Sequence, residues 1–436
     1  MSVNASSRVG PVRLGLLGCG NVGSALVDLV AEHADLLTAR AGTGIVVARV
    51  AVRDLAKARD VKLAADRFTD DAGSVVTDDG VDLIVEVIGG IEPARALITQ
   101  ALRAGKPVVT GNKELIALHG PELFAVAADA GVDLLFEASV AGGIPLIRPL
   151  RESLAGDRIH RVLGIVNGTT NYILTRMTEE GSSFADALAE AQRLGYAEAD
   201  PTADVEGHDA AAKAAIIATI AFGALVGPDD VYCEGITQVS ADDIESAKTL
   251  GYVVKLLAVA EEIEGAIAVR VHPAMVPLHH PLASVRDAFN AVFIEGEAVG
   301  ELMFYGRGAG GGPTASAVLG DVVDAVRNLV SGAKGATVAG LVARPIRPVD
   351  DTESPFYVLM EVADRPGVLA AIAGAFGDHG VSIKSMEQRG IGDEARLIFI
   401  THRAREADLR ATLDAVRGVE HVHRVGSVLR VVGEDD

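Results

Sequence analysis

Cysteine is scarce in this chain of 436 residues, which contains only Cys19 and Cys233. The two lie far apart, and neither belongs to a CxxC or a His/Cys cluster. This pattern predicts neither a disulfide framework nor a structural zinc site. We expect both thiols to be small buried side chains.

The sequence also lacks a long apolar run. No stretch reaches the roughly 18 residues that span a bilayer, and the one that comes closest, 210–226, is interrupted by Lys213. The N-terminus, residues 1–11, is polar and has no signal-peptide core. The expectation is a soluble cytoplasmic protein that has no membrane partner.

Basic residues are too few to balance the acidic ones, with 39 Lys and Arg against 60 Asp and Glu and a formal net charge of −21. Such a surface repels phosphates, so a nucleic-acid partner is not expected. The chain is 49% hydrophobic and long enough to bury several cores. Its length predicts about three domains.

Short apolar runs alternate with helical segments up to about residue 138. The runs are 12–17, 45–52, 81–88, 106–110 and 132–137, and the helical segments are 22–37, 93–104 and 114–130. Strands that alternate with helices predict an α/β fold with a parallel, doubly wound sheet of the Rossmann type.

A glycine motif follows the first of these strands and opens a helix. It reads Gly18-Cys19-Gly20-Asn21-Val22-Gly23. Gly18 would allow a tight turn, Gly20 a close approach to a pyrophosphate, and Gly23 close packing of helix on strand. The first amides of the helix, at Asn21 and Val22, would face the phosphates. The motif therefore predicts a dinucleotide site and a nicotinamide-dependent dehydrogenase.

The end of the second strand bears on the choice of cofactor. Arg53, with Lys57 one turn later, would suit the 2′-phosphate of NADP. Asp54 would instead accept a hydrogen bond from a ribose hydroxyl, and Arg53 and Lys57 would then be ordinary surface charges. The sequence leaves NADP and NAD both open.

The pattern changes to an α+β arrangement after about residue 139. Helical segments are expected at 171–180, 184–194 and 209–226, and strands at 159–166, 267–276 and 291–296. Asp209 and Lys213 share a helix face because they lie four residues apart. Partial desolvation would make the lysine a usable proton carrier, although the spacing alone favours an ordinary surface ion pair.

The last part of the chain follows a linker at 338–351 that contains three prolines. From residue 356 to residue 432 the order is strand, helix, strand, strand, helix, strand, with the last strand broken by Gly426. This βαββαβ order predicts a ferredoxin-like domain. Before the linker, a glycine-rich segment at 305–312 leads into a helix at 315–329.

Three segments closely resemble homoserine dehydrogenases. They are the string from Gly195 to Asp209 with Lys213, the motif Thr110-Gly111-Asn112-Lys113, and residues 136–140. The resemblance covers about residues 10 to 345, with Gly111 standing where alanine is common. It implies an NAD(P)-dependent oxidoreductase acting on a CH–OH group, which interconverts L-homoserine and L-aspartate 4-semialdehyde on the pathway to threonine, methionine and isoleucine.

The resemblance also implies roles for particular residues. Lys213 matches the proton donor and acceptor, Glu198 and Asp209 match homoserine-binding carboxylates, and Lys113 matches a lysine near cofactor and substrate. Gly195 and Gly310 match positions near the cofactor, although a flexible hinge would also explain the glycines around Gly310. Another Rossmann dehydrogenase of amino-acid metabolism and a non-catalytic sensor of NAD(P)H and amino acids remain alternatives.

A monovalent cation site is implied in the same way. Glu137 and the backbone carbonyls of Val140, Gly142 and Ile144 would ligate sodium, because hard cations prefer oxygen ligands. Without the resemblance, these residues would be interpreted as a plain glycine turn.

The segment Asp364–Leu369, followed by Ile383–Gln388, resembles an ACT domain. Such modules pair side by side and bind small amino acids at the shared edge. Loop amides before a helix suit a carboxylate, and Gln388 would add a contact. The resemblance implies feedback control by an amino acid, with threonine as the first candidate, or else a purely structural dimerisation module. A homodimer or homotetramer is expected.

Taken together, the patterns predict three domains. They are a Rossmann NAD(P)-binding domain at 1–138 and 306–345, a catalytic, substrate-binding and dimerisation domain of α+β type at 139–305, and a ferredoxin-like ACT regulatory domain at 352–436.

Overall fold

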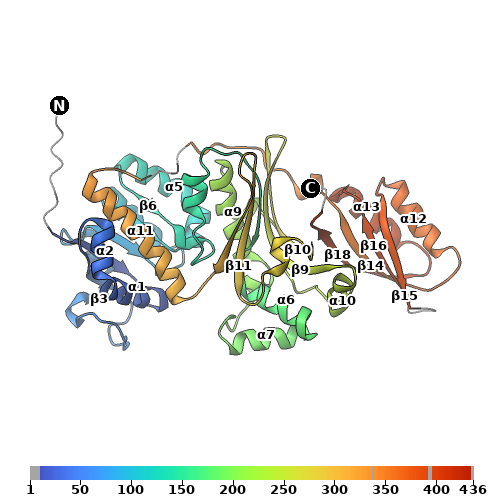
Figure 1. The fold of residues 1–436 in the computed structure, drawn as a ribbon, viewed down its shortest axis with the longest axis horizontal. Coiled ribbons are helices and arrows are strands. Elements are labelled where there is room, and N and C mark those ends of the chain that lie inside the picture. The colour runs from blue at the N-terminus through green and yellow to red at the C-terminus, as the bar shows by residue number, and fades with distance from the viewer. Residues whose placement is uncertain (1–9, 336–337, 339, 391–394, 434–436) are drawn as a thin grey trace. The chain divides into compact units, whose positions relative to one another are not determined.

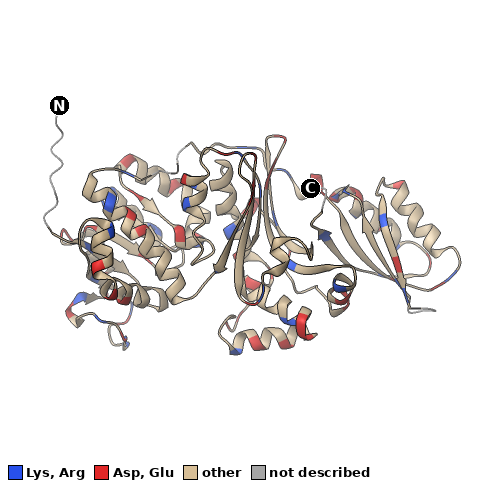
Figure 2. Ribbon diagram, in the orientation of Figure 1, with Lys and Arg blue, Asp and Glu red and all other residues tan. Residues whose placement is uncertain are grey.

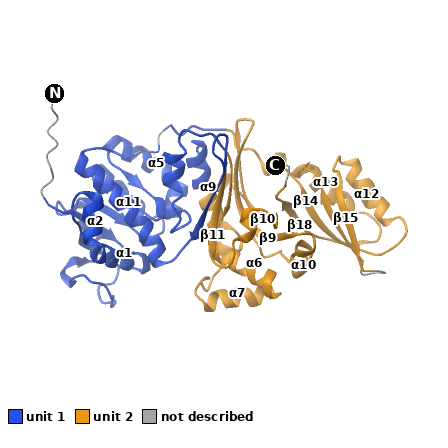
Figure 3. Ribbon diagram, in the orientation of Figure 1, with its two compact units in different colours: residues 1–159, 215–228, 295–344 blue, residues 160–214, 229–294, 345–436 orange. Residues whose placement is uncertain are grey.

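The computed structural model describes residues 10–335, 338, 340–390 and 395–433 (Figure 1). Contacts divide the chain into two compact units (Figure 3). Unit 1 comprises residues 1–159, 215–228 and 295–344, and unit 2 comprises residues 160–214, 229–294 and 345–436. The predicted polar N-terminus lies, for residues 1–9, outside the described residues.

Unit 1 contains a parallel sheet of six strands in the order β3-β2-β1-β4-β5-β6. The strands are β1 (Val12–Leu17), β2 (Ile45–Ala51), β3 (Phe68–Thr69), β4 (Leu83–Glu86), β5 (Val108–Thr110) and β6 (Leu134–Leu135). The predicted Rossmann-type sheet is confirmed. Its order reverses between β1 and β4, and doubly wound sheets bind ligands outside the carboxyl ends of the strands at that point.

Six helices accompany this sheet. They are α1 (Asn21–Glu32), α2 (Ala34–Ala41), α3 (Ala72–Thr77), α4 (Ala94–Arg103), α5 (Lys113–Ala130) and α11 (Gly311–Ser331). Helix α11 packs on α1, so a segment from late in the chain completes the core around Leu14, Leu26 and Val322. The helix expected at 22–37 is wrong in one respect, because His33 separates α1 from α2.

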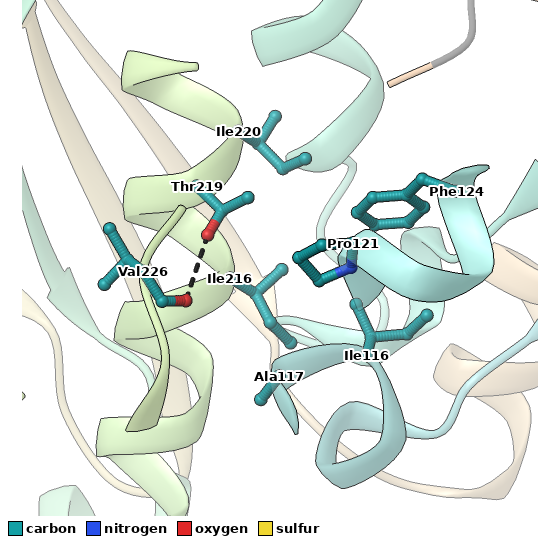
Figure 4. A pocket seen from close by; sticks show the side chains of 8 residues that line it. All are labelled: Ile116, Ala117, Pro121, Phe124, Ile216, Thr219, Ile220 and Val226. Atoms are coloured by element: carbon teal, nitrogen blue, oxygen red, sulfur yellow. Dashed lines mark hydrogen bonds between the residues drawn. The ribbon is translucent and has the colours of Figure 1, made fainter. Parts of the chain in front are cut away.

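Part of α9 (His208–Phe222) also belongs to unit 1, where it packs on α5. Figure 4 shows Ile216 and Ile220 of α9 facing Ile116 and Phe124 of α5, with only a small pocket between them. Thr219 Oγ1 donates to the Val226 carbonyl at 3.2 Å. The helix predicted at 209–226 is four residues too long, because α9 ends at Phe222. The next residue, Gly223, is left-handed with φ of +61°.

Unit 2 contains a mixed sheet in the order β11-β7-β9-β10-β18-β14-β16-β15, with β8 also paired to β10. The strands that precede the last module are β7 (Ile159–Ile165), β8 (Tyr232–Cys233), β9 (Tyr252–Ile263), β10 (Ala266–Pro277) and β11 (Phe289–Gly296). Strands β9 and β10 form a twelve-residue antiparallel hairpin. Strand β9 was not predicted, since it is buried on both faces over most of its length and its sequence shows no alternation.

The helices of this part of unit 2 are α6 (Gly168–Glu180), α7 (Phe184–Arg193), α8 (Thr202–Val205), the first half of α9, and α10 (Ala241–Thr249). Helix α10 packs on α6 and on β9. Acidic residues are spread over helices of both units (Figure 2). In the part of the chain that the structure describes, no helix is long and apolar enough to cross a membrane.

The last module has the order β14 (Phe356–Val362), α12 (Val368–Asp378), β15 (Ile383–Arg389), β16 (Ala395–Thr401), α13 (Glu406–Arg417) and β18 (Val422–Val431). Its antiparallel order β18-β14-β16-β15 confirms the ferredoxin-like prediction. The expected break at Gly426 is wrong, because β18 runs through it with a shift of register against β14.

Strand β18 also pairs in parallel with β10, through Ala274 with Arg430 and Met275 with Val431. The module's sheet is therefore continuous with the sheet that precedes it in unit 2. The remaining strands of the described residues are β12 (Gly300–Arg307) and the two-residue strands β13 (Glu353–Ser354) and β17 (Ala404–Arg405).

Two glycines of unit 1 offer a matched test of close packing. A Cβ at Gly23 would lie 2.3 Å from the Gly18 carbonyl oxygen, whereas a Cβ at Gly111 would lie 3.5 Å from Ala138 Cβ. We expect Gly23→Ala to lower the free energy of unfolding by about 1–3 kcal/mol. Gly111→Ala should raise it by up to about 1 kcal/mol, because alanine restricts the unfolded chain. Denaturant unfolding measures both, and equal effects would contradict the packing argument.

Candidate active site

The glycine motif forms the turn between β1 and α1. Gly18 has a φ of +100°, and a Cβ there would lie 2.8 Å from the Val87 carbonyl oxygen. Gly20 precedes α1, no side chain caps that helix, and no atom lies within 4 Å of where a Gly20 Cβ would be. Helix amides without a side-chain cap are suited to an anion, so the turn can cradle a pyrophosphate between Gly20 and the amides of Asn21 and Val22.

The start of α11 meets this turn. Gly310 precedes the helix with a φ of +120°, and a Cβ at Gly311 would lie 3.0 Å from the Asn21 carbonyl oxygen. Gly311 therefore allows two helix N-termini to approach each other. Close packing explains Gly311, and the hinge stays an alternative for the other glycines of the 305–312 segment.

Charged residues lie just beyond β2. The side chains of Arg53 and Lys57 are exposed. The Asp54 carboxylate accepts a hydrogen bond from the Ala56 amide at 2.8 Å and so is part of its own turn.

Neither cysteine adds chemistry to these features. Cys19 is buried, as expected, with its Sγ 3.5 Å from Ser24 Oγ. Cys233 is half-buried, and burial raises the pKa of its thiol to about 11. Both thiols are free.

Lys113 is the first residue of α5 and is half-buried. Asn112 caps this helix, since its Oδ1 accepts the Leu115 amide at 3.1 Å. Behind this helix start lies Glu86, the last residue of β4, which is fully buried. Burial raises the pKa of the Glu86 carboxyl, while hydrogen bonds to it act in the opposite direction. The sequence offered one overlooked signal, a lone acid at the end of an apolar strand.

Lys213 forms a buried contact in unit 2. Its Nζ donates to Asp209 Oδ2 at 2.6 Å and to the Val166 carbonyl at 2.7 Å. The two side chains are only 12% and 6% exposed. The surface ion pair that the spacing alone favoured is therefore wrong, and the lysine is shielded from water.

Asn167 orients this pair, and the sequence analysis missed it. Its Oδ1 caps α6 by accepting the Thr170 amide at 2.9 Å. Its Nδ2 donates to Asp209 Oδ2 at 2.9 Å and to Asp204 Oδ1 at 2.7 Å. An Asn-Gly pair between a strand and a helix was a signal for the cap, but not for the carboxylates. We call Asn167, Asp204, Asp209 and Lys213 the lysine cluster.

Glu198 and Gly195 lie on the segment that follows α7. The Glu198 side chain is exposed, and in the structure as described its carboxylate lies outside the hydrogen bonds of the lysine cluster. Its backbone carbonyl accepts Gln192 Nε2 at 3.1 Å. Gly195 has a φ of +78° and ends the turn after α7.

Glu137 lies in the loop after β6, and its side chain contacts the backbone of residues 146–148. The Glu137 carboxylate is buried and accepts hydrogen bonds from the amides of Leu146, Ile147 and Arg148. Its own amide donates to Asp321 Oδ2 at 2.8 Å. Burial raises the pKa of Asp321 to about 7. Glu137 thus serves first as a cap for three amides.

The same loop carries the backbone carbonyls of Val140, Gly142 and Ile144, whose hydrogen bonding differs from that of the Glu137 carboxylate. Within the described ranges, no backbone amide donates to any of the three. Ala141 and Gly142 are both left-handed, with φ of +56° and +51°, so the backbone turns sharply here. No group of three or more His, Cys, Asp or Glu side chains that could hold a metal occurs among the described residues.

A parallel sheet with its glycine turn at the switch point is the arrangement of a dinucleotide-binding Rossmann domain. The fold and this turn define the class of Rossmann dinucleotide-binding proteins.

Comparisons with known proteins identify the family. The family model for homoserine dehydrogenase matches residues 145–323, that for its NAD-binding domain matches residues 18–137, and that for the ACT domain matches residues 356–421. Homoserine dehydrogenase of Corynebacterium glutamicum is 51% identical over 425 residues, which cover 96% of this chain and 95% of that protein. The chain belongs to the homoserine dehydrogenase family.

Solved structures agree with this assignment. The crystal structure of a homoserine dehydrogenase from Thiobacillus denitrificans has a TM-score of 0.92 and 42% identity, covering 97% of this chain and 98% of that one. A hyperthermophilic archaeal homoserine dehydrogenase in complex with NADPH has a TM-score of 0.62 and 30% identity, covering 72% and 97%. The chain is thus an oxidoreductase that acts on a CH–OH group, as the resemblance implied, and not a non-catalytic sensor.

Asn167 can be tested without removing its helix cap. Asn167→Asp keeps a capping oxygen but puts a third carboxylate beside Asp204 and Asp209. Hydrogen bonds to charged groups contribute about 1.5–3 kcal/mol, so we expect kcat/KM for homoserine to fall about tenfold or more. Asn167→Ser is the matched comparison, because it keeps a cap and adds no charge but also removes the Nδ2 donor, so it should lose activity too, though less than Asn167→Asp. Steady-state kinetics showing parental kcat/KM in Asn167→Ser would argue against the orienting role.

Proposed function

We propose that Lys213 is the proton donor and acceptor in the NAD(P)-dependent interconversion of L-homoserine and L-aspartate 4-semialdehyde. The observation that supports this is the contact of Lys213 Nζ with Asp209 at 2.6 Å and with the Val166 carbonyl at 2.7 Å. Two acceptors fix the position of the amine, and burial keeps bulk water from competing for the proton. Position and shielding are what a general acid or base requires.

The proposed chemistry divides between cofactor and protein. The nicotinamide ring exchanges a hydride with the terminal carbon of the substrate. Lys213 takes the hydroxyl proton in the oxidising direction and returns a proton to the developing alkoxide in the reducing direction. A positioned proton carrier contributes roughly 10²–10⁴-fold. Lys113, at the start of α5, would stabilise the developing negative charge.

Substrate binding is assigned to carboxylates. The lysine cluster has two carboxylates for one ammonium, and this excess of negative charge suits the α-ammonium group of homoserine. We propose that Asp209 and Glu198 hold the ammonium group and the hydroxyl. The exposed carboxylate of Glu198 is available for such a contact.

NADP is the preferred cofactor in this proposal, with NAD as a second. The side chains of Arg53 and Lys57 are exposed, whereas the Asp54 carboxylate accepts a hydrogen bond within its own turn. The two basic side chains therefore suit a 2′-phosphate. Further contacts would come from the glycine motif, Lys113, Gly195 and Gly310. The relative from a hyperthermophilic archaeon is in complex with NADPH.

The residues around Gly142 fit a monovalent cation such as sodium. The carbonyls of Val140, Gly142 and Ile144, which no described backbone amide engages, would be its ligands. The Glu137 carboxylate already accepts three amides, so it would hold the loop in shape rather than bind the ion through both oxygens. The ion would stabilise the turn, and no proton or hydride passes through it.

Domain division, assembly and location remain predictions of the sequence. We propose the three domains at 1–138 with 306–345, at 139–305 and at 352–436. We also propose a homodimer or homotetramer, a cytoplasmic location, and a place on the route to threonine, methionine and isoleucine.

We propose feedback control through the ACT domain, with threonine as effector. The loop before α12 is exposed, with Gly367 at φ of +93°, and Gln388 is exposed on the edge strand β15. Amides there are suited to an amino-acid carboxylate. A module that serves dimerisation alone would keep the same fold without a response.

A buried link would carry that response within unit 2. Asp243 of α10 accepts Ser427 Oγ at 2.6 Å and Tyr357 OH at 3.3 Å, both from the ACT sheet. Helix α10 packs on α6, which begins at the Asn167 cap. A shift of the ACT sheet would therefore reach the helix that orients Asp209.

The catalytic proposal is tested by homoserine oxidation with NAD and with NADP, followed at the nicotinamide absorbance. We expect turnover by the parent chain and a fall of about 10²–10⁴-fold in kcat for Lys213→Ala. Lys248→Ala, which removes an exposed lysine of α10, is the control and should keep parental kcat. Parental turnover by Lys213→Ala, or none by the folded parent with either cofactor, would refute the proposal.

Feedback is tested by titrating threonine into the same assay. We expect inhibition of the parent chain and, for Ser427→Ala, a shift of about fivefold or more in the half-maximal concentration at unchanged basal kcat. Arg396→Ala is the control, because its partner Asp242 lies on the same helix but the pair is exposed. No response of the parent to threonine would contradict threonine control, and an unshifted Ser427→Ala would contradict the Asp243 link.

A further inference from the structure

We propose that Glu86 is a positioning residue that joins the loops after β4 and β5 at the carboxyl edge of the Rossmann sheet and so holds Lys113 and the cofactor loops in register. The inference deepens the proposed function, because it depends on Lys113 lying near the cofactor. All the contacts that carry it lie within unit 1.

The Glu86 carboxylate directs all of its described hydrogen bonds toward this edge. Oε1 accepts the amides of Ile88 at 2.8 Å and Gly89 at 3.1 Å, in the loop that follows β4. Oε2 accepts Thr110 Oγ1 at 2.5 Å, at the end of the neighbouring strand β5. One buried side chain therefore links the loops after two adjacent strands.

The link extends to the start of α5. Thr110 Oγ1 accepts the Asn112 amide at 3.0 Å, which leaves the hydroxyl hydrogen for Glu86. Asn112 Nδ2 donates to the Gly90 carbonyl at 2.6 Å, and Asn112 Oδ1 caps α5. The two loops are thus bonded twice, and the next residue along the chain is Lys113.

The loop after β4 also touches the glycine motif. The Val87 amide donates to the Leu17 carbonyl at 2.9 Å, and the Val87 carbonyl is what a Cβ at Gly18 would strike. Gly89 and Gly90 are left-handed, with φ of +74° and +72°, and open space surrounds the positions of their absent Cβ atoms. These loops flank the point where the strand order reverses, which is where such sheets bind dinucleotides.

Core stability alone does not account for an acid here. The three preceding residues of β4 are buried and apolar, and an apolar side chain would extend that core. A buried carboxyl costs free energy unless it is hydrogen-bonded, and the bonds that compensate Glu86 are made to loops rather than to the core. The hydrogen bonds of Glu86 therefore fix the positions of the loops, whereas an apolar side chain would only add buried surface to the core.

Thr110→Val tests the link with little change of shape, because it removes only the hydroxyl. We expect it to raise the Kd for NADPH and to lower kcat/KM about tenfold or more. Thr110→Ser restores the hydroxyl and should recover most of the loss. Glu86→Gln should behave like Thr110→Val, since the amide oxygen would stay with the Ile88 and Gly89 amides and the nitrogen in place of Oε2 cannot accept the threonine proton. Fluorescence titration gives the Kd, and thermal unfolding shows that each variant is folded.

A double-mutant cycle separates positioning from plain stabilisation. If the link acts through Lys113, Thr110→Val should lower kcat by less than about twofold in a chain that already carries Lys113→Ala. A full tenfold loss in that background, or parental kcat, KM and Kd in Thr110→Val with only a lower Tm, would overturn the proposal. A parent chain without turnover would count against the proposed function instead, and the NADPH titration would still test the link.

Discussion

A lysine ammonium held against a carboxylate away from water is the constraint on which the proposed substrate site depends. Burying two charges is favourable only when further hydrogen bonds satisfy them. Lys213 obtains one from the Val166 carbonyl, and Asp209 obtains one from Asn167. The end of β7, the cap of α6 and the start of α9 must therefore be placed together, because each supplies one partner of the pair.

The nucleotide side meets a related constraint with different chemistry. At the glycine motif, space is made by leaving side chains out, as the 2.3 Å approach to Gly23 illustrates. At the edge beyond β4 and β5, shape is fixed by a buried carboxyl and a threonine. Open backbone beside rigid hydrogen-bonded loops is what a flat, charged cofactor requires of its binding surface.

Sequence patterns predicted the parts that depend on local order. The strand that ends at Gly18 and the ferredoxin-like order after residue 356 follow from periodicity and glycine placement, and both were confirmed. Asn167 and Glu86 were missed because their partners, Asp209 and Thr110, lie 42 and 24 residues away. Spacing put Asp209 and Lys213 on one helix face but carried no information on what covers it. Strand β9 escaped because residues buried on both faces do not alternate.

The parallel pairing of β18 with β10 makes the proline-containing linker a misleading place to divide the protein. Removing the C-terminal module would strip β10 of its neighbour at Ala274 and Met275 and would leave Glu234 without Arg430, which is removed with the module. The newly bared strand edge would be apolar and open to pairing with other chains, a known route to aggregation. A truncated form that precipitates would therefore be uninformative about the proposed regulation, since the cut that removes the module also exposes this strand edge.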